Sequence, residues 1–100
     1  MVANRLNISP EKLSDFCRRH GVRRLSLFGS VLRNDFSPES DVDVLVEFLP
    51  GRTPGMLGFG QMILELSEIM GRQVDLRTPQ DLSEYFRDEV LQTAQLLHAA

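Results

Sequence analysis

The sequence has 100 residues, of which 42% are hydrophobic, so its size and composition are those of one small folded domain with a single core. A net charge of −3 and a pI of about 5.3 argue against a general nucleic-acid binder, because phosphate backbones are bound by basic surfaces. The single Cys17 forms no internal disulfide, and neither a signal peptide nor an apolar run of about 18 residues is present, so the expected location is cytoplasmic and no membrane is expected as a partner.

The first predicted element is a helix that begins after Ser9. Ser9 is a good N-cap, and Pro10 fits the first helical position, where its missing N–H costs nothing. Gly21 is a suitable residue to end this helix. Residues 1–8 are expected to form a flexible N-terminus.

Arginines gather near the end of this helix. Either they are surface charges that favour the negative end of the helix dipole, or they form a lip that attracts a nucleotide or an acidic partner. These residues are Arg18, Arg19, Arg23 and Arg24.

Two strands are predicted next, joined by a polar, turn-rich segment. Leu25–Phe28 form the first strand, and Gly29-Ser30 lead into a short helical turn over residues 31–33. Asp41–Phe48 form the second strand, where alternate residues face opposite sides of a sheet. Its valines then face the core, whereas Asp41 and Asp43 share the other face, about 6.5 Å apart along the strand.

This pair of aspartates predicts a cation site. Two neighbouring carboxylates repel each other unless a cation lies between them, and hard oxygen ligands suit Mg²⁺ or Mn²⁺. Gly29 has no Cβ, so a ligand can approach the backbone closely, and a helix that starts at Ser30 would favour a phosphate.

A second long helix and a third strand follow. Thr53-Pro54 supply an N-cap and a first helical residue, and apolar residues recur at helical spacing as far as Gly71. We interpret its methionines as core, with a binding groove as the alternative. Gln73–Arg77 form the third strand, where Asp75 stands between apolar neighbours, an unfavourable position for a purely structural residue.

The last predicted element is a C-terminal helix after Thr78-Pro79, marked by apolar residues from Leu82 to Leu97 and bent near Arg87. The fold class is therefore α/β: a small mixed β-sheet with helices packed on one face, which leaves the carboxylates open on the other face.

The spacing of Gly29-Ser30, ten further residues and Asp41-Val42-Asp43 resembles the signature of the DNA polymerase β-like nucleotidyltransferases. At this length the sequence is similar to the minimal nucleotidyltransferases (MNT), and the resemblance covers roughly residues 9 to 97. Arg33 falls where that family often has a basic residue. Many MNT proteins are antitoxins encoded beside HEPN ribonuclease toxins.

The resemblance implies a site and a reaction for the single domain of residues 1–100. Asp41, Asp43 and Asp75 would be catalytic and would bind two Mg²⁺ or Mn²⁺ ions, with ATP as the substrate. Ser30 would orient the triphosphate beside Gly29 and Arg33. AMP would be transferred to a tyrosine of a HEPN toxin, since a chain of this length has to borrow its acceptor site from a partner.

Two other functions stay open. The protein could silence a toxin by non-covalent masking, or it could transfer nucleotides to a small molecule or RNA within a larger complex. The three carboxylates favour the enzyme, because masking does not require them. The number of AMP units and the oligomeric state are left open.

Overall fold

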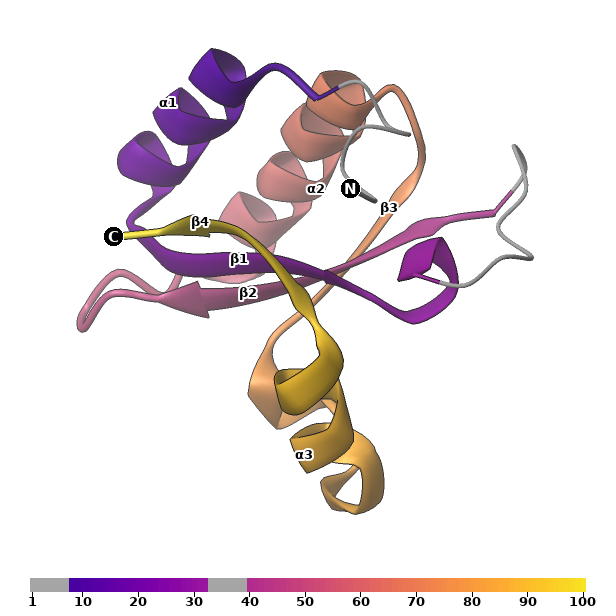
Figure 1. Ribbon diagram of the computed structural model, residues 1–100. Helices are drawn as coiled ribbons and strands as arrows, with labels where there is room; N and C mark the ends of the chain where they lie inside the picture. The colour runs from indigo at the N-terminus through magenta and orange to yellow at the C-terminus, as the bar shows by residue number, and fades with distance from the viewer. Residues whose placement is uncertain (1–7, 33–39) are drawn as a thin grey trace.

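A four-stranded mixed sheet in the order β3-β2-β1-β4 forms the centre of the computed structural model, which describes residues 8–32 and 40–100 (Figure 1). The inner strands are antiparallel to each other, β1 pairs with β4 in the same way, and β2 is parallel to β3. In chain order, the elements are α1 (Pro10–His20), β1 (Val22–Phe28), the 3₁₀ helix η2 (Gly29–Leu32), β2 (Val42–Phe48), α2 (Met56–Met70), β3 (Val74–Arg77), the 3₁₀ helix η3 (Pro79–Asp81), α3 (Glu84–Thr93) and β4 (Gln95–Ala99).

The ends of α1 are those predicted from the sequence. The Ser9 side chain accepts a hydrogen bond from the Lys12 backbone N–H at 3.4 Å, and Pro10 is the first helical residue. Gly21 ends the helix in the left-handed conformation, at φ 66°, where its N–H faces the carbonyls of the last turn. The polypeptide then enters β1 directly.

The core lies between the sheet and the helices α1 and α2, which cover one of its faces (Figure 1). The alternation in β2 is confirmed, because Val42, Val44 and Val46 are fully buried against these helices. The prediction that methionines of α2 are core residues is confirmed for Met62 and Met70. Met56 is 93% exposed and is no part of the core.

The second long helix begins later than predicted. Thr53 was expected to be its N-cap, but Gly55 takes that place with an extended backbone, and its carbonyl accepts from the Phe59 N–H at 2.9 Å. The prediction was wrong because Pro54 would have required helical backbone at Gly55, and glycine has a low helix propensity. Glycines at 58 and 60 weaken the same turns.

The predicted C-terminal helix was wrong in its extent. Residues 79–81 form η3, Leu82 is extended, Ser83 caps α3, and residues 95–99 form β4. Pairing of these last residues with the free edge of β1 outweighs helix propensity, because each edge N–H and carbonyl then gains a partner. The break also lies before Arg87, where the bend was expected.

Helix α3 projects from the side of the sheet opposite to α1 and α2 (Figure 1). It has no buried residue, and Tyr85 is 92% exposed. Arg87 secures its start by donating hydrogen bonds to the carbonyls of Pro79 and Leu82 at 2.7 and 3.0 Å. Within the described parts of the chain, no helix has the length and apolar character needed to cross a bilayer.

We predict that Leu66→Ala lowers the free energy of unfolding by about 2–5 kcal/mol, because Leu66 is fully buried in the core. The matched control is Leu64→Ala in the same helix, where the side chain is 69% exposed and the expected change is within about 0.5 kcal/mol. Urea unfolding curves measure both. Equal losses for the two leucines would contradict the assigned core face of α2.

Candidate active site

The parallel pairing of β2 with β3 places two of the predicted aspartates side by side. Asp43 is the direct partner of Asp75 in the register, and paired strands lie about 4.8 Å apart. Both side chains emerge on the face that α1 and α2 leave uncovered. Asp41 stands just before β2 and is exposed. Leu45, on the same face as Asp43, is 2% exposed, so this face is covered beyond the aspartates.

The Gly29-Ser30 turn lies directly against Asp43, because Phe28, the last residue of β1, pairs with Asp43. Gly29 has φ 74°, and a Cβ at this position would overlap the Asp43 carboxylate. The backbone N–H of Ser30 donates a hydrogen bond to that carboxylate. The Ser30 hydroxyl lies 3.5 Å from the backbone carbonyl oxygen of Asp41. The turn and the carboxylate strand thus form one unit, as the sequence spacing indicated.

The surroundings of Asp43 disfavour the ionised form of its carboxyl group. Burial raises its pKa above the ordinary value of 3.8, and the negative charges of Asp75 and Asp41 raise it further. The Ser30 N–H and the positive charge of Arg77 lower it, but the net shift is upward. A cation bound here would stabilise the ionised form of Asp43.

Arg77 is a site residue that sequence reasoning missed. Its Nε lies 3.0 Å from Asp75 Oδ1, and its Nη2 lies 3.3 Å from Asp75 Oδ2. The two residues stand two positions apart in β3, so their side chains share one face. That i, i+2 spacing of opposite charges in a predicted strand is the signal that could have revealed the pair.

The chemistry of the donor set fits a divalent cation. Asp41, Asp43 and Asp75 offer only carboxylate oxygens, which suit Mg²⁺ or Mn²⁺. The pKa of Asp43 is raised chiefly by burial and further by the two neighbouring carboxylates, and a bound cation would offset both effects. Among residues 8–32 and 40–100, however, no three acidic, histidine or cysteine side chains are gathered closely enough to enclose an ion. The register brings Asp43 and Asp75 together, and Asp41, two residues before Asp43, is near enough for its charge to raise the pKa of Asp43. Arg33 lies outside the described residues, and its role stays a prediction.

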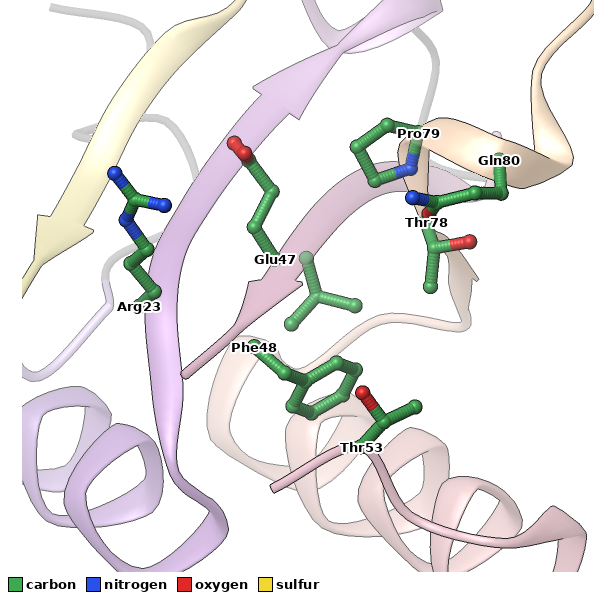
Figure 2. A pocket seen from close by; sticks show the side chains of 8 residues that line it. Arg23, Glu47, Phe48, Thr53, Thr78, Pro79 and Gln80 are labelled. Atoms are coloured by element: carbon green, nitrogen blue, oxygen red, sulfur yellow. The ribbon is translucent and has the colours of Figure 1, made fainter. Parts of the chain in front are cut away.

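A pocket of about 470 Å³ opens at the other end of β2 (Figure 2). Glu47 and Arg23 extend toward it from neighbouring strands, and Thr78 and Gln80 line it from the segment after β3. Its volume is that of a small-molecule site. Glu47 is four residues beyond Asp43, or about 13 Å along the strand, so the pocket is distinct from the carboxylate pair. Of the residues that line it, Arg23 was singled out from the sequence, as part of the group of arginines that could attract a nucleotide.

Comparison with known proteins identifies the family. The family described as "Nucleotidyltransferase domain" matches residues 10–97. The solved structure of a candidate minimal nucleotidyltransferase is 35% identical, with a TM-score of 0.74, and the match covers 94% of each chain. The chain is a minimal nucleotidyltransferase. The family and the mixed α/β fold expected from the sequence are therefore confirmed.

Two further relatives of this minimal nucleotidyltransferase are informative. A Methanocaldococcus jannaschii protein named as a candidate protein adenylyltransferase is 35% identical over 89 residues, which cover 89% of this chain and 94% of the relative. A solved structure that holds a tri-AMPylated HEPN toxin of Shewanella oneidensis with an MNT antitoxin has a TM-score of 0.63 at 19% identity, covering 91% of this chain and 70% of that chain. The second match shows a shared fold.

We predict that Gly29→Ala costs about 1–3 kcal/mol more stability than Gly51→Ala. Both glycines have the same left-handed backbone, with φ of 74° and 76°, so the backbone cost is matched. The new methyl group meets the Asp43 carboxylate at position 29 and open space at position 51. Urea unfolding measures the difference, and similar losses for both variants would show that Gly29 does not touch Asp43.

We predict that Asp43→Asn raises the melting temperature of the metal-free protein at pH 7. The pKa of Asp43 is raised in the folded state, so folding is opposed once pH rises above 3.8 and through the folded pKa. The advantage of the variant should vanish below about pH 3.8, where the carboxyl is protonated in both states. Thermal melts in EDTA at pH 7 and pH 3.5 provide the measurement.

Asp15→Asn is the control for this experiment, because the pKa of Asp15 is shifted in the opposite direction to that of Asp43. The pKa of Asp15 is lowered, chiefly by its hydrogen bond with Arg19, so its ionised form is favoured in the folded state. This variant should not gain melting temperature at pH 7. A similar gain for both variants would mean that reduced negative charge in general, and not the surroundings of Asp43, is responsible.

Proposed function

We propose that this minimal nucleotidyltransferase transfers AMP from ATP to a tyrosine hydroxyl of a HEPN-family ribonuclease toxin and thereby acts as its antitoxin. The observation that carries the proposal is the register of Asp43 with Asp75 directly beside the Gly29-Ser30 turn. The relative named as a candidate protein adenylyltransferase and the neighbour containing an AMPylated HEPN toxin support the acceptor class.

The residues divide the work of an in-line displacement. Asp41, Asp43 and Asp75 would hold Mg²⁺ or Mn²⁺, two ions in all, which when bound would neutralise charge on the attacking and leaving oxygens. Gly29 leaves space for the triphosphate. The Ser30 hydroxyl makes a long contact of 3.5 Å with the Asp41 carbonyl and would turn from it to donate to a phosphate oxygen.

Asp75 has the role of proton acceptor in this scheme. The tyrosine hydroxyl gives its proton to the Asp75 carboxylate while the phenolic oxygen forms a bond to the α-phosphorus of ATP. The bond between the α-phosphorus and its bridging oxygen to the β-phosphorus breaks, and pyrophosphate leaves with the electron pair. The product is a tyrosine–AMP phosphodiester on the toxin.

A protein acceptor is favoured over RNA or a small molecule by the surface around the site. The net charge of −3 disfavours RNA. Helix α3, on the same side of the sheet as the carboxylates, exposes Tyr85, Phe86 and Leu91. Exposed apolar side chains beside a site are typical of surfaces that bind proteins. The same surface would serve an antitoxin that masks its toxin without chemistry.

We predict that Asp75→Asn abolishes transfer but keeps toxin binding, because asparagine has nearly the same shape but neither holds a metal well nor accepts the proton. The proposed acceptor, a HEPN ribonuclease encoded beside this protein, is incubated with ATP, Mg²⁺ and the wild-type protein or the variant. The antitoxin is then removed, and the toxin is weighed by intact-mass spectrometry and assayed for RNase activity. Asp15→Asn, a neutralised surface aspartate on α1, is the matched control.

The proposal requires one or more AMP-sized increments and lasting loss of RNase activity with the wild type and the control. It also requires that Asp75→Asn produce neither effect after the antitoxin is removed. An unchanged toxin mass, combined with full protection of cells by Asp75→Asn, would instead support masking by contact.

A further inference from the structure

Arg77 already occupies the carboxylate that the second metal ion would need. Its guanidinium spans both oxygens of Asp75, with contacts of 3.0 and 3.3 Å, a two-point arrangement that a planar guanidinium forms well. Asp43, the direct neighbour of Asp75 across the strands, instead receives a backbone N–H from Ser30. The two carboxylates of the pair therefore have different partners, and only Asp75 is paired with a full positive charge.

The ion pair between Arg77 and Asp75 can be broken at a small cost in free energy. The side chains are 47% and 39% exposed, and an ion pair in contact with water contributes only about 0–1 kcal/mol. Asp81 lies close enough for its charge, like that of Asp43, to act on Arg77. When the guanidinium leaves Asp75, it therefore still lies near the negative charges of Asp81 and Asp43. This reduces the free energy needed to release Asp75.

We infer that Arg77 is the resident counter-ion of Asp75 when no metal is bound, and that a divalent cation binds at Asp75 only by displacing it. This inference rests on the proposed carboxylate site and adds a positioning residue to it. In the metal-free protein, Arg77 offsets the repulsion between Asp75 and Asp43. When a metal enters, the same positive charge competes with it. Arg77 therefore stabilises the empty site and weakens metal binding.

The test is Mn²⁺ binding, followed by electron paramagnetic resonance of the free ion, without nucleotide or toxin. Arg77→Gln should bind Mn²⁺ about 2–10-fold more tightly than the wild type, because a competing cation has been removed. Arg18→Gln is the matched control, since it removes the same charge from a 75% exposed side chain on α1. Its Mn²⁺ affinity should equal that of the wild type.

Two further variants identify the cause. Arg77→Lys keeps the charge but cannot span both oxygens, so its gain in affinity should be smaller than that of Arg77→Gln. In an Asp75→Asn background, Arg77→Gln should give no gain, because the contested carboxylate is gone. Equal Mn²⁺ affinity for Arg77→Gln and Arg18→Gln, or weaker binding by Arg77→Gln, would overturn the inference.

A second readout does not depend on metal affinity. In EDTA, Arg77→Gln should melt below the wild type, because the positive charge that offsets the repulsion of Asp75 and Asp43 has been removed, and saturating Mn²⁺ should reduce the difference. An Arg77→Gln variant as stable as wild type in EDTA would overturn the counter-ion role.

The carboxylate site itself is tested separately with Asp41→Asn/Asp43→Asn. If this double variant binds Mn²⁺ as well as wild type does, the proposed metal site fails. If it loses binding while Arg77→Gln behaves like Arg18→Gln, only the inference about Arg77 fails.

Discussion

The in-register pairing of Asp43 with Asp75 is the constraint on which the rest of the site depends. Backbone hydrogen bonds of a parallel strand pair fix these two carboxylates beside each other, whatever their mutual repulsion. The residues around the pair accommodate its negative charge. Because Gly29 has no side chain, there is space for the Asp43 carboxylate, and the Ser30 N–H donates a hydrogen bond to that carboxylate. Arg77 forms an ion pair with the neighbouring Asp75.

The sheet can hold this unfavourable arrangement because its other face is tightly packed. Alternate residues of β2 are valines that are fully buried under α1 and α2. Successive residues of a strand face opposite sides of the sheet. The seven residues of β2 therefore bury valines on one side and present the Asp43 carboxylate on the other. Changes to these carboxylates therefore leave the packing of the core on the other face intact.

Local signals made much of this structure predictable. The cap at Ser9, the glycine at 21 and the alternation in β2 are set by neighbouring residues, and each was predicted from them. Features decided by distant partners were not. The strand β4 depends on the open edge of β1, which no local pattern reveals. The contact of Arg77 with Asp75 is local, and the spacing of opposite charges two positions apart in β3 could have indicated it. The role of Arg33 remains a prediction from resemblance alone.

The pairing of β4 with β1 has a consequence during synthesis of the chain. The outer edge of β1 is complete at Phe28, but the strand that covers it begins at Gln95. At about 5–20 residues per second, the ribosome needs roughly 3–13 s to make the intervening segment. During that interval the nascent chain presents an unpaired strand edge, the kind of surface that recruits strands of other chains. Strand β4 thus completes the sheet and also covers the edge of β1 through which the chain could pair with other chains.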